Sequence, residues 1–228
     1  MKRTLLALCT LIFASSASAT LIVNNAVSGS VTNDFEDLAS GSTAGFFSQS
    51  GATYGEHFAG QTVSGTTFDV LSGTPTVPLT LVAASSIDDN IGILTYLGSQ
   101  TIFGDKSFAT GEGAISILLD SVSNIFGYEV VGADSGTGNI TTDFFGVTGT
   151  LLGSFTLTSS DSFFGFEVTS GELIKGISIY NTDGGGIAYD NFTFNTDAVV
   201  PPTDVPAPAT MALLGLGLAF IGARRRMK

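Results

Sequence analysis

The strongest constraint on the fold is the pattern of short apolar stretches and turns between Thr20 and Asn195. Apolar or aromatic residues alternate with Ser, Thr or Asn in Ser154–Thr158, Ile177–Tyr180 and Asn191–Phe194. Glycine-rich turns recur at strand-length spacing, and no stretch keeps a helical period for twelve residues. The pattern predicts an all-β protein, namely an antiparallel β-sandwich that is jelly-roll-like.

Four further stretches refine this expectation. Leu79–Ala84 and Ala114–Leu119 are apolar almost throughout, which predicts more fully buried strands. Phe126–Val130 and Phe164–Val168 differ at one position, so we expect two equivalent strands with their aromatic rings and valines inward and their glutamates outward. A duplicated carboxylate site is the alternative interpretation of this echo.

The charge distribution limits the partners of the protein. All twenty acidic residues lie between Asp34 and Asp204, where Lys106 and Lys175 are the only basic residues. Because phosphate binding depends on Lys and Arg, we expect no nucleic-acid partner. The acidic surface favours cations or simply keeps the protein soluble. The one cysteine, Cys9, lies in the N-terminal segment, so the rest of the chain has neither a disulfide nor a thiol nucleophile.

Residues 1–19 have the three parts of a secretory signal peptide. A basic start precedes the apolar run Leu5–Ala14, and the small residues Ala17 and Ala19 form a small-x-small cleavage site. We therefore predict that signal peptidase cleaves just before Thr20 and that the protein is exported across the inner membrane.

The C-terminal segment 205–228 combines a proline motif, a short apolar stretch and a basic end. These parts are Val205, Pro206, Ala207 and Pro208, then Met211–Ala223, then Arg224, Arg225 and Arg226. An apolar helix of this length spans about 20 Å, whereas a bilayer core is about 30 Å thick. We expect a short membrane helix that holds the precursor, with its basic end in the cytoplasm, and that is too short for a permanent anchor.

The order of these features resembles the PEP-CTERM sorting signal of Gram-negative bacteria that make exopolysaccharide. The resemblance implies that an exosortase-like membrane protease recognises the proline motif and processes the tail. Ala207 stands where the usual motif has glutamate. Residues 198–204 contain two adjacent prolines and are interpreted as a stiff linker that holds the motif clear of the β domain, residues 20–197.

The middle of the chain resembles the sandwich domains often found upstream of this signal, on the segments Asp34–Gly41 and Phe163–Phe194. The resemblance to jelly-roll carbohydrate-binding modules implies a structural calcium ion between an acidic residue of the first strand and one of the last. Here Glu36 (or Asp34) would meet Asp190 across the sandwich edge. In the alternative interpretation these carboxylates are solvated or cap turns. No other cofactor is expected.

The remaining residues point away from catalysis. His57 is the only histidine, nothing resembles Gly-x-Ser-x-Gly, and zinc would need ligands that the chain after the signal peptide lacks. Sugar binding needs aromatic platforms, and the candidates are Tyr54, Tyr96, Tyr128, Tyr180 and Tyr189.

The expected function is that of an exported, non-enzymatic protein of the cell surface or extracellular matrix. An exosortase-like system would process it, and exopolysaccharide or a biofilm would be its setting. The alternatives are a calcium-dependent carbohydrate-binding module and, third, a polysaccharide hydrolase that uses paired carboxylates.

Overall fold

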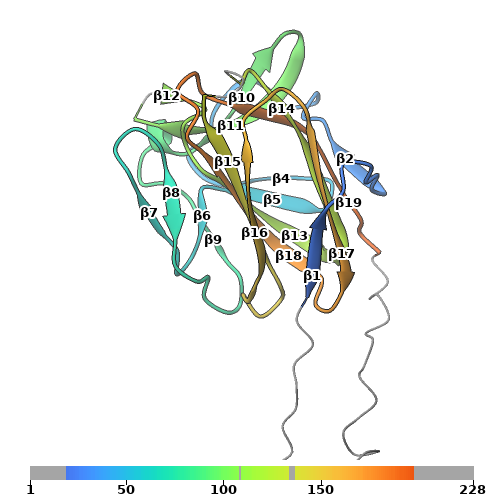
Figure 1. Cartoon of the computed structure of the whole chain (residues 1–228). Coiled ribbons are helices and arrows are strands. Elements are labelled where there is room, and N and C mark those ends of the chain that lie inside the picture. Colours follow the sequence, from blue (N-terminus) through green and yellow to red (C-terminus); the bar gives the residue numbers. More distant parts are fainter. Residues whose placement is uncertain (1–18, 108, 134–136, 198–228) are drawn as a thin grey trace, which may run out of the picture. The chain divides into compact units, whose positions relative to one another are not determined.

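A computed structural model describes residues 19–107, 109–133 and 137–197 (Figure 1). The predicted signal peptide up to Ser18, the linker 198–204 and the sorting segment 205–228 lie outside the described residues. Strand β1 (Thr20–Val23) begins at the residue that follows the predicted cleavage site. Within the described ranges, no helix has both the length and the apolar character needed to cross a membrane.

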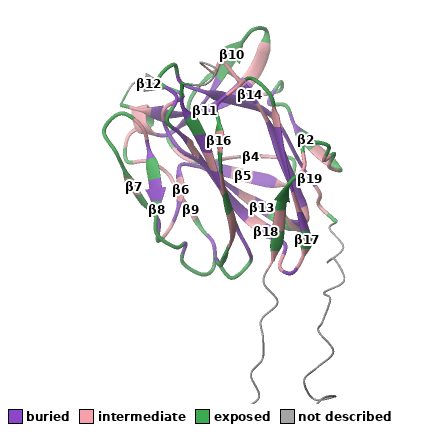
Figure 2. Ribbon diagram, viewed as in Figure 1, coloured by how far each residue is buried: buried purple, intermediate pink, exposed green. Residues whose placement is uncertain are grey.

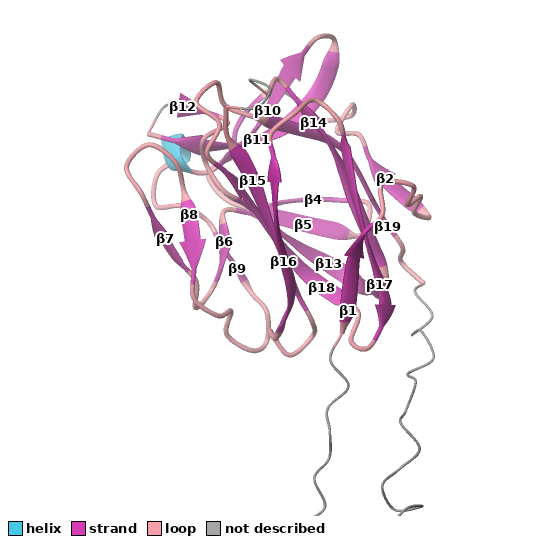
Figure 3. Ribbon diagram, in the orientation of Figure 1, coloured by secondary structure: helices cyan, strands magenta, loops and turns pink. Residues whose placement is uncertain are grey.

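Strands make up 55% of the described part of the chain and their pairs are antiparallel, so the predicted all-β antiparallel class is confirmed (Figure 3). The larger sheet follows the order β1, β17 (Phe163–Ser170), β14 (Ile125–Val131), β19 (Ala188–Phe194), β11 (Ser99–Lys106), β10 (Ile91–Tyr96) and β3 (Gly41–Ser42). Two short strands join it, β2 (Val31–Asn33) beside β19 and β12 (Ala109–Thr110) beside β11.

The second sheet has the order β16 (Leu151–Thr158), β15 (Asn139–Phe145), β18 (Ile174–Asn181), β13 (Ile115–Ser123), β5 (Ala52–Gly55) and β4 (Phe47–Gln49). Two small ribbons pair β6 (His57–Phe58) with β9 (Leu81–Val82) and β7 (Thr62–Ser64) with β8 (Val70–Ser72). A single 3-10 turn, η1 (Ile87–Asp89), interrupts the β structure described here.

An aromatic core joins the two large sheets. Phe144 of β15 meets Phe126 of β14 and Phe166 of β17, with ring centroids 6.2 Å and 4.8 Å apart. The hydroxyls of Tyr128 and Thr142 also form a hydrogen bond of 2.7 Å from one sheet to the other. Buried residues line the inner faces of both sheets (Figure 2). The alternation seen in the sequence thus buries one side of each strand between the sheets.

From β13 to β19 the chain crosses repeatedly between the sheets. Strands β13, β15, β16 and β18 belong to the six-stranded sheet, while β14, β17 and β19 belong to the larger one. Neighbouring strands such as β11 and β19 are therefore far apart in the sequence. This long-range pairing brings together residues that are distant in the sequence, among them Glu36, Ser99 and Asp190.

The two similar segments lie side by side. Phe126 of β14 pairs with Phe166 of β17, and Gly127 pairs with Gly165. The aromatic rings and valines of both strands are buried, while Glu129 and Glu167 are half-buried on the outer side, as the sequence predicts. The echo therefore marks two adjacent strands of one sheet with equivalent inner faces.

The prediction of a fully buried strand over Leu79–Ala84 is wrong. Only Leu81 and Val82 form a strand, and both are half-buried. This segment packs on the outside of the six-stranded sheet, where Leu79, Phe58 and Phe145 form a small hydrophobic cluster separate from the main core. An apolar run shows that a segment is covered, but not which face of a sheet covers it.

The hairpin between β10 and β11 contains a strained residue. Tyr96 pairs with Ser99, so Leu97 and Gly98 form a two-residue turn, and both have positive φ angles, 50° and 95°. Leucine avoids this left-handed region because its Cβ crowds the backbone, and this leucine is also 91% exposed. Asn-Gly is the pair that such a turn prefers.

We predict that Leu97→Asn stabilises the protein by about 1 kcal/mol, because asparagine tolerates the left-handed conformation. A gain of this size raises Tm by about 2–4 °C in a domain of this length, which thermal unfolding can measure. Leu97→Ala is the matched control, since it removes the exposed side chain but keeps the backbone strain. An equal gain in both variants would mean that exposure, not the turn, is unfavourable.

Candidate functional site

Glu36 and Asp190, the two residues predicted to meet at the sandwich edge, approach the same side chain. The Ser99 hydroxyl lies 2.7 Å from Glu36 Oε1 and 2.8 Å from Asp190 Oδ2. The backbone N–H groups of Gln100 and Asn191 donate to Glu36 and Asp190 at 3.1 Å and 2.7 Å. Since a hydroxyl carries one proton, Ser99 donates to only one carboxylate at a time.

Three separate elements position this group. Ser99 begins β11 and Asp190 lies in β19, two neighbouring strands of the larger sheet. Glu36 lies in the loop after β2, next to Phe35, whose fully buried ring packs against Tyr54 and other aromatic rings of the core. The buried ring anchors the loop and so places the exposed Glu36 side chain over the end of β11.

The two carboxyl groups differ in their electrostatics. The hydrogen bonds from Ser99 and from the Gln100 N–H lower the pKa of Glu36. Burial raises the pKa of Asp190; the hydrogen bonds from Ser99 and the Asn191 N–H oppose this rise, and the charges of Glu129 and Glu36 add to it. The pKa values of the two carboxyl groups are therefore shifted in opposite directions, down for Glu36 and up for Asp190.

The calcium prediction for Glu36 and Asp190 stays a prediction. The structure brings the two side chains together, but among the residues it describes no three His, Cys, Asp or Glu side chains are grouped so that they could hold a metal ion. Asp34, the alternative to Glu36, accepts a hydrogen bond of 3.3 Å from the Glu36 N–H. That contact is of the turn-capping kind.

Most of the tyrosines considered as sugar platforms are inaccessible. Tyr54, Tyr128 and Tyr189 are at most 1% exposed, and burial raises the pKa of each hydroxyl. Tyr180 is half-buried, whereas Tyr96 is 37% exposed and lines a cleft. Among the five candidates, Tyr96 is therefore the one whose ring a ligand can reach most readily.

Sequence reasoning did not identify the cleft that Tyr96 lines. Its walls come from four separate segments, 94–96, 110–111, 131–132 and 185–188. These segments are joined only by long-range strand pairing, so their spacing in the sequence carries no signal. The unusual Leu97-Gly98 turn beside Tyr96 was the local feature that could have drawn attention to this hairpin.

His57 and Lys106 line a second cleft, of about 410 Å³, together with Glu56 and Asp89. The His57 Nδ1 atom lies 3.0 Å from Glu56, and Lys106 forms an ion pair of 2.7 Å with the fully buried Asp69. Burial raises the pKa of Asp69, and the Lys106 ammonium opposes this rise. Lys106 thus neutralises an internal carboxylate, which leaves the surface of the domain with very little positive charge.

The residues of the predicted sorting signal and Ala17 of the signal-peptide cleavage site lie outside the described residues. The sorting signal can be compared with known proteins, whereas cleavage after Ala19 stays a prediction. The folded part alone defines an antiparallel all-β domain, followed by a tail.

Residues 204–226 match the family model described as the PEP-CTERM protein-sorting motif. The chain therefore carries a PEP-CTERM sorting motif, as the resemblance of its tail predicted. Such a motif implies an exported protein with a C-terminal sorting signal that an exosortase recognises at the membrane. No curated protein and no solved structure matches the chain.

We predict that mild acidification stabilises the folded domain. Among the residues that the structure describes, burial raises the pKa of five carboxyl groups, and hydrogen bonds lower that of Glu36; the five are Asp69, Asp105, Glu112, Asp143 and Asp190. A carboxyl with a raised pKa binds its proton more tightly in the folded state, so stability rises as pH falls toward the unfolded values near 4.

The measurement is Tm between pH 7 and pH 5 in the presence of a chelator. The net charge of −12 acts in the same direction, because protonation reduces repulsion. Molar salt screens that repulsion but not the burial effect, so part of the rise should persist in salt. A Tm that falls steadily from pH 7 to pH 5 would contradict the prediction.

Proposed function

We propose that the protein is a non-enzymatic component of the cell surface or extracellular matrix, sorted by an exosortase and associated with exopolysaccharide. The observation that carries this proposal is the sorting motif at residues 204–226, which follows in the sequence the β domain described between residues 19 and 197. The acidic surface of the domain supports the proposal, because a high net charge keeps an exported protein soluble. The domain also contains no cysteine, so its folding does not depend on disulfide formation outside the cell.

Processing by the exosortase is tested by the mass of the exported protein. In a host that has the protease, we expect a product that lacks Arg224, Arg225 and Arg226; in a strain without it, we expect these residues to be retained. Replacing both Pro206 and Pro208 with alanine should mimic the protease-deficient strain. Ala207→Glu is the matched control and should be processed normally, since it restores the usual motif.

Identical C-terminal masses in the two strains would refute the sorting proposal. The non-enzymatic part is tested separately: the exported protein should release no reducing sugar from the exopolysaccharide of its host. Release of sugar would instead favour the hydrolase alternative, and replacement of Asp190 and Glu36 would then show whether they form the carboxylate pair.

A calcium-dependent carbohydrate-binding module is the second candidate, favoured by the convergence of Glu36 and Asp190 on Ser99. The crossing strands support it as well. Strands β11, β19, β14 and β17 face β13, β18, β15 and β16, and we assign this arrangement to a jelly roll, an architecture that lectin domains use. That support is an analogy between folds, and a fold does not define a ligand. The ligand must be identified by binding measurements.

For this second candidate, calcium at millimolar concentration should raise the Tm of the protein, because a ligand that binds only the folded state stabilises it. Asp190→Asn keeps the shape of the side chain but removes its charge, and should abolish the rise. Ser99→Ala leaves both carboxylates in place and is the control that should still respond. Equal shifts for the wild type and Asp190→Asn would exclude calcium binding at this position.

A further inference from the structure

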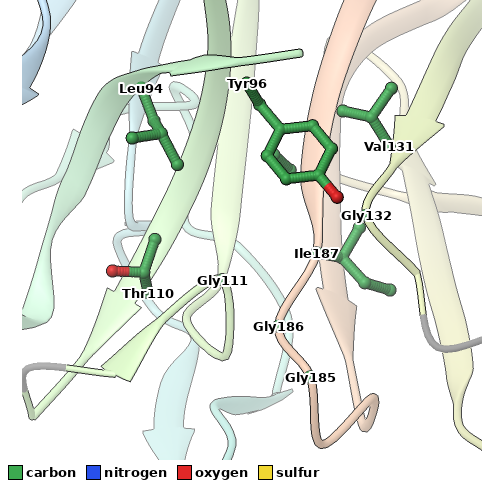
Figure 4. A pocket seen from close by; sticks show the side chains of 10 residues that line it. Leu94, Tyr96, Thr110, Gly111, Val131, Gly132, Gly185, Gly186 and Ile187 are labelled. Carbon is green, nitrogen blue, oxygen red and sulfur yellow. The ribbon is translucent and has the colours of Figure 1, made fainter.

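The Tyr96 cleft opens between the β10–β11 hairpin and the loops on either side of it (Figure 4). The Tyr96 ring leans from the hairpin toward Gly132, and Leu94, Val131 and Ile187 supply apolar walls. The cleft has a volume of about 200 Å³. An apolar cavity of about 150 Å³ holds a benzene molecule, so this cleft has room for one six-membered ring.

The rest of the cleft is built from backbone. Gly111 and Gly186 both have positive φ angles, and a Cβ on either one would clash with the backbone of the facing segment. The Gly111 carbonyl accepts hydrogen bonds from the Ile187 N–H at 3.1 Å and from the Asn181 amide at 2.8 Å. The wall opposite Tyr96 is therefore held rigidly before any ligand arrives, which lowers the entropic penalty of binding.

The charge of the cleft indicates what kind of ligand fits. None of the ten residues that line it is charged. Two neighbouring strands, β14 and β19, extend beyond the cleft. Val131 of the cleft wall pairs with Ala188, and two residues further along the strands Glu129 pairs with Asp190. This second pair therefore lies about 7 Å from the first, on the same outer face of the sheet. Carboxylates accept hydrogen bonds from hydroxyl groups and repel anions.

Ser99, which contacts both Glu36 and Asp190, is the cross-strand partner of Tyr96. Directly opposed residues of an antiparallel pair project to the same side of the sheet. The Tyr96 ring and the Ser99 hydroxyl therefore lie on one side of the hairpin, and the carboxylates that Ser99 contacts, Glu36 and Asp190, reach this side from neighbouring elements. A sugar presents apolar C–H faces and, at its rim, hydroxyl donors. The Tyr96 ring suits the C–H faces, and the nearby carboxylates suit the hydroxyls.

We propose that the Tyr96 cleft binds one uncharged sugar ring of a glycan, with the ring against Tyr96 and a hydroxyl toward the half-buried Glu129. Asp190 is only 4% exposed and already accepts hydrogen bonds from Ser99 and Asn191, so it contributes negative charge and no direct contact. The proposal deepens the second candidate function, since it names the place and class of the sugar, but it requires no calcium ion. Sugars that carry carboxylates or sulfates are excluded by the acidic border.

The cleft and the C-terminal end of the last strand lie far apart. The cleft lies at the start of β19, at Ala188, whereas the strand ends at Phe194, after which Asn195 and Thr196 are still hydrogen-bonded to the domain. Seven residues of extended chain separate the two points by about 20 Å. The proposed sugar site and the C-terminal end of β19 therefore lie at opposite ends of one strand.

The test is binding of a panel of uncharged mono- and disaccharides to the exported protein, by calorimetry or by NMR, with glucuronic acid as the charged comparison. We expect millimolar affinity for at least one uncharged sugar and none for glucuronic acid. Tyr96→Ala should weaken binding about tenfold, since it removes the aromatic contact, and Tyr96→Phe should retain most of it. Leu94→Thr, on another wall, should weaken binding as well.

Phe46→Ala is the matched control, because Phe46 is a 50% exposed ring that does not line the cleft. All variants are first compared by thermal unfolding. Undiminished binding by folded Tyr96→Ala, or no binding of any uncharged sugar at 10 mM, would overturn the proposal. If sugar binding persists in a chelator but is lost in Tyr96→Ala, the cleft is supported as the site and binding there does not require calcium. Neither outcome affects the processing test, which measures C-terminal mass.

Discussion

The contact of Phe144 with Phe126 and Phe166 is the interaction on which the rest of the domain depends. These rings come from three strands in two sheets, and all three are buried. Large aromatic side chains bury much apolar area, and edge-to-face contacts add specific geometry. Because β14 and β17 are neighbours in one sheet while β15 lies in the other, closing this cluster fixes the sheets face to face and sets the position of every loop at their edges.

Local pattern in the sequence was enough to find the strands but not their partners. Alternation located β16, β18 and β19 because the period of two is a property of each strand alone. The similarity of Phe126–Val130 to Phe164–Val168 revealed two equivalent inner faces, but not that these strands are neighbours. The run Leu79–Ala84 was misassigned because burial beneath a surface ribbon and burial inside the sandwich produce the same apolar pattern.

The functional sites also differ in how far the sequence could predict them. Resemblance to known sandwich domains paired Glu36 with Asp190, and the structure does bring both to Ser99, although Ser99 itself was not anticipated. The sorting tail is a linear motif, so its order of proline, apolar and basic parts could be read directly. The Tyr96 cleft is assembled by strand register from four segments, and no spacing rule in the sequence would have found it.

Strand β19 connects the features that matter for attachment. It begins at the Tyr96 cleft, carries Asp190, and ends where the chain departs toward the sorting signal. It lies in the interior of its sheet, hydrogen-bonded to β14 along one edge and to β11 and β2 along the other. If a glycan were pulled at one end of β19 while the chain beyond Phe194 was held, tension would run lengthwise through this strand. The hydrogen bonds of β19 to β14, β11 and β2 would then share the load in shear instead of breaking one after another.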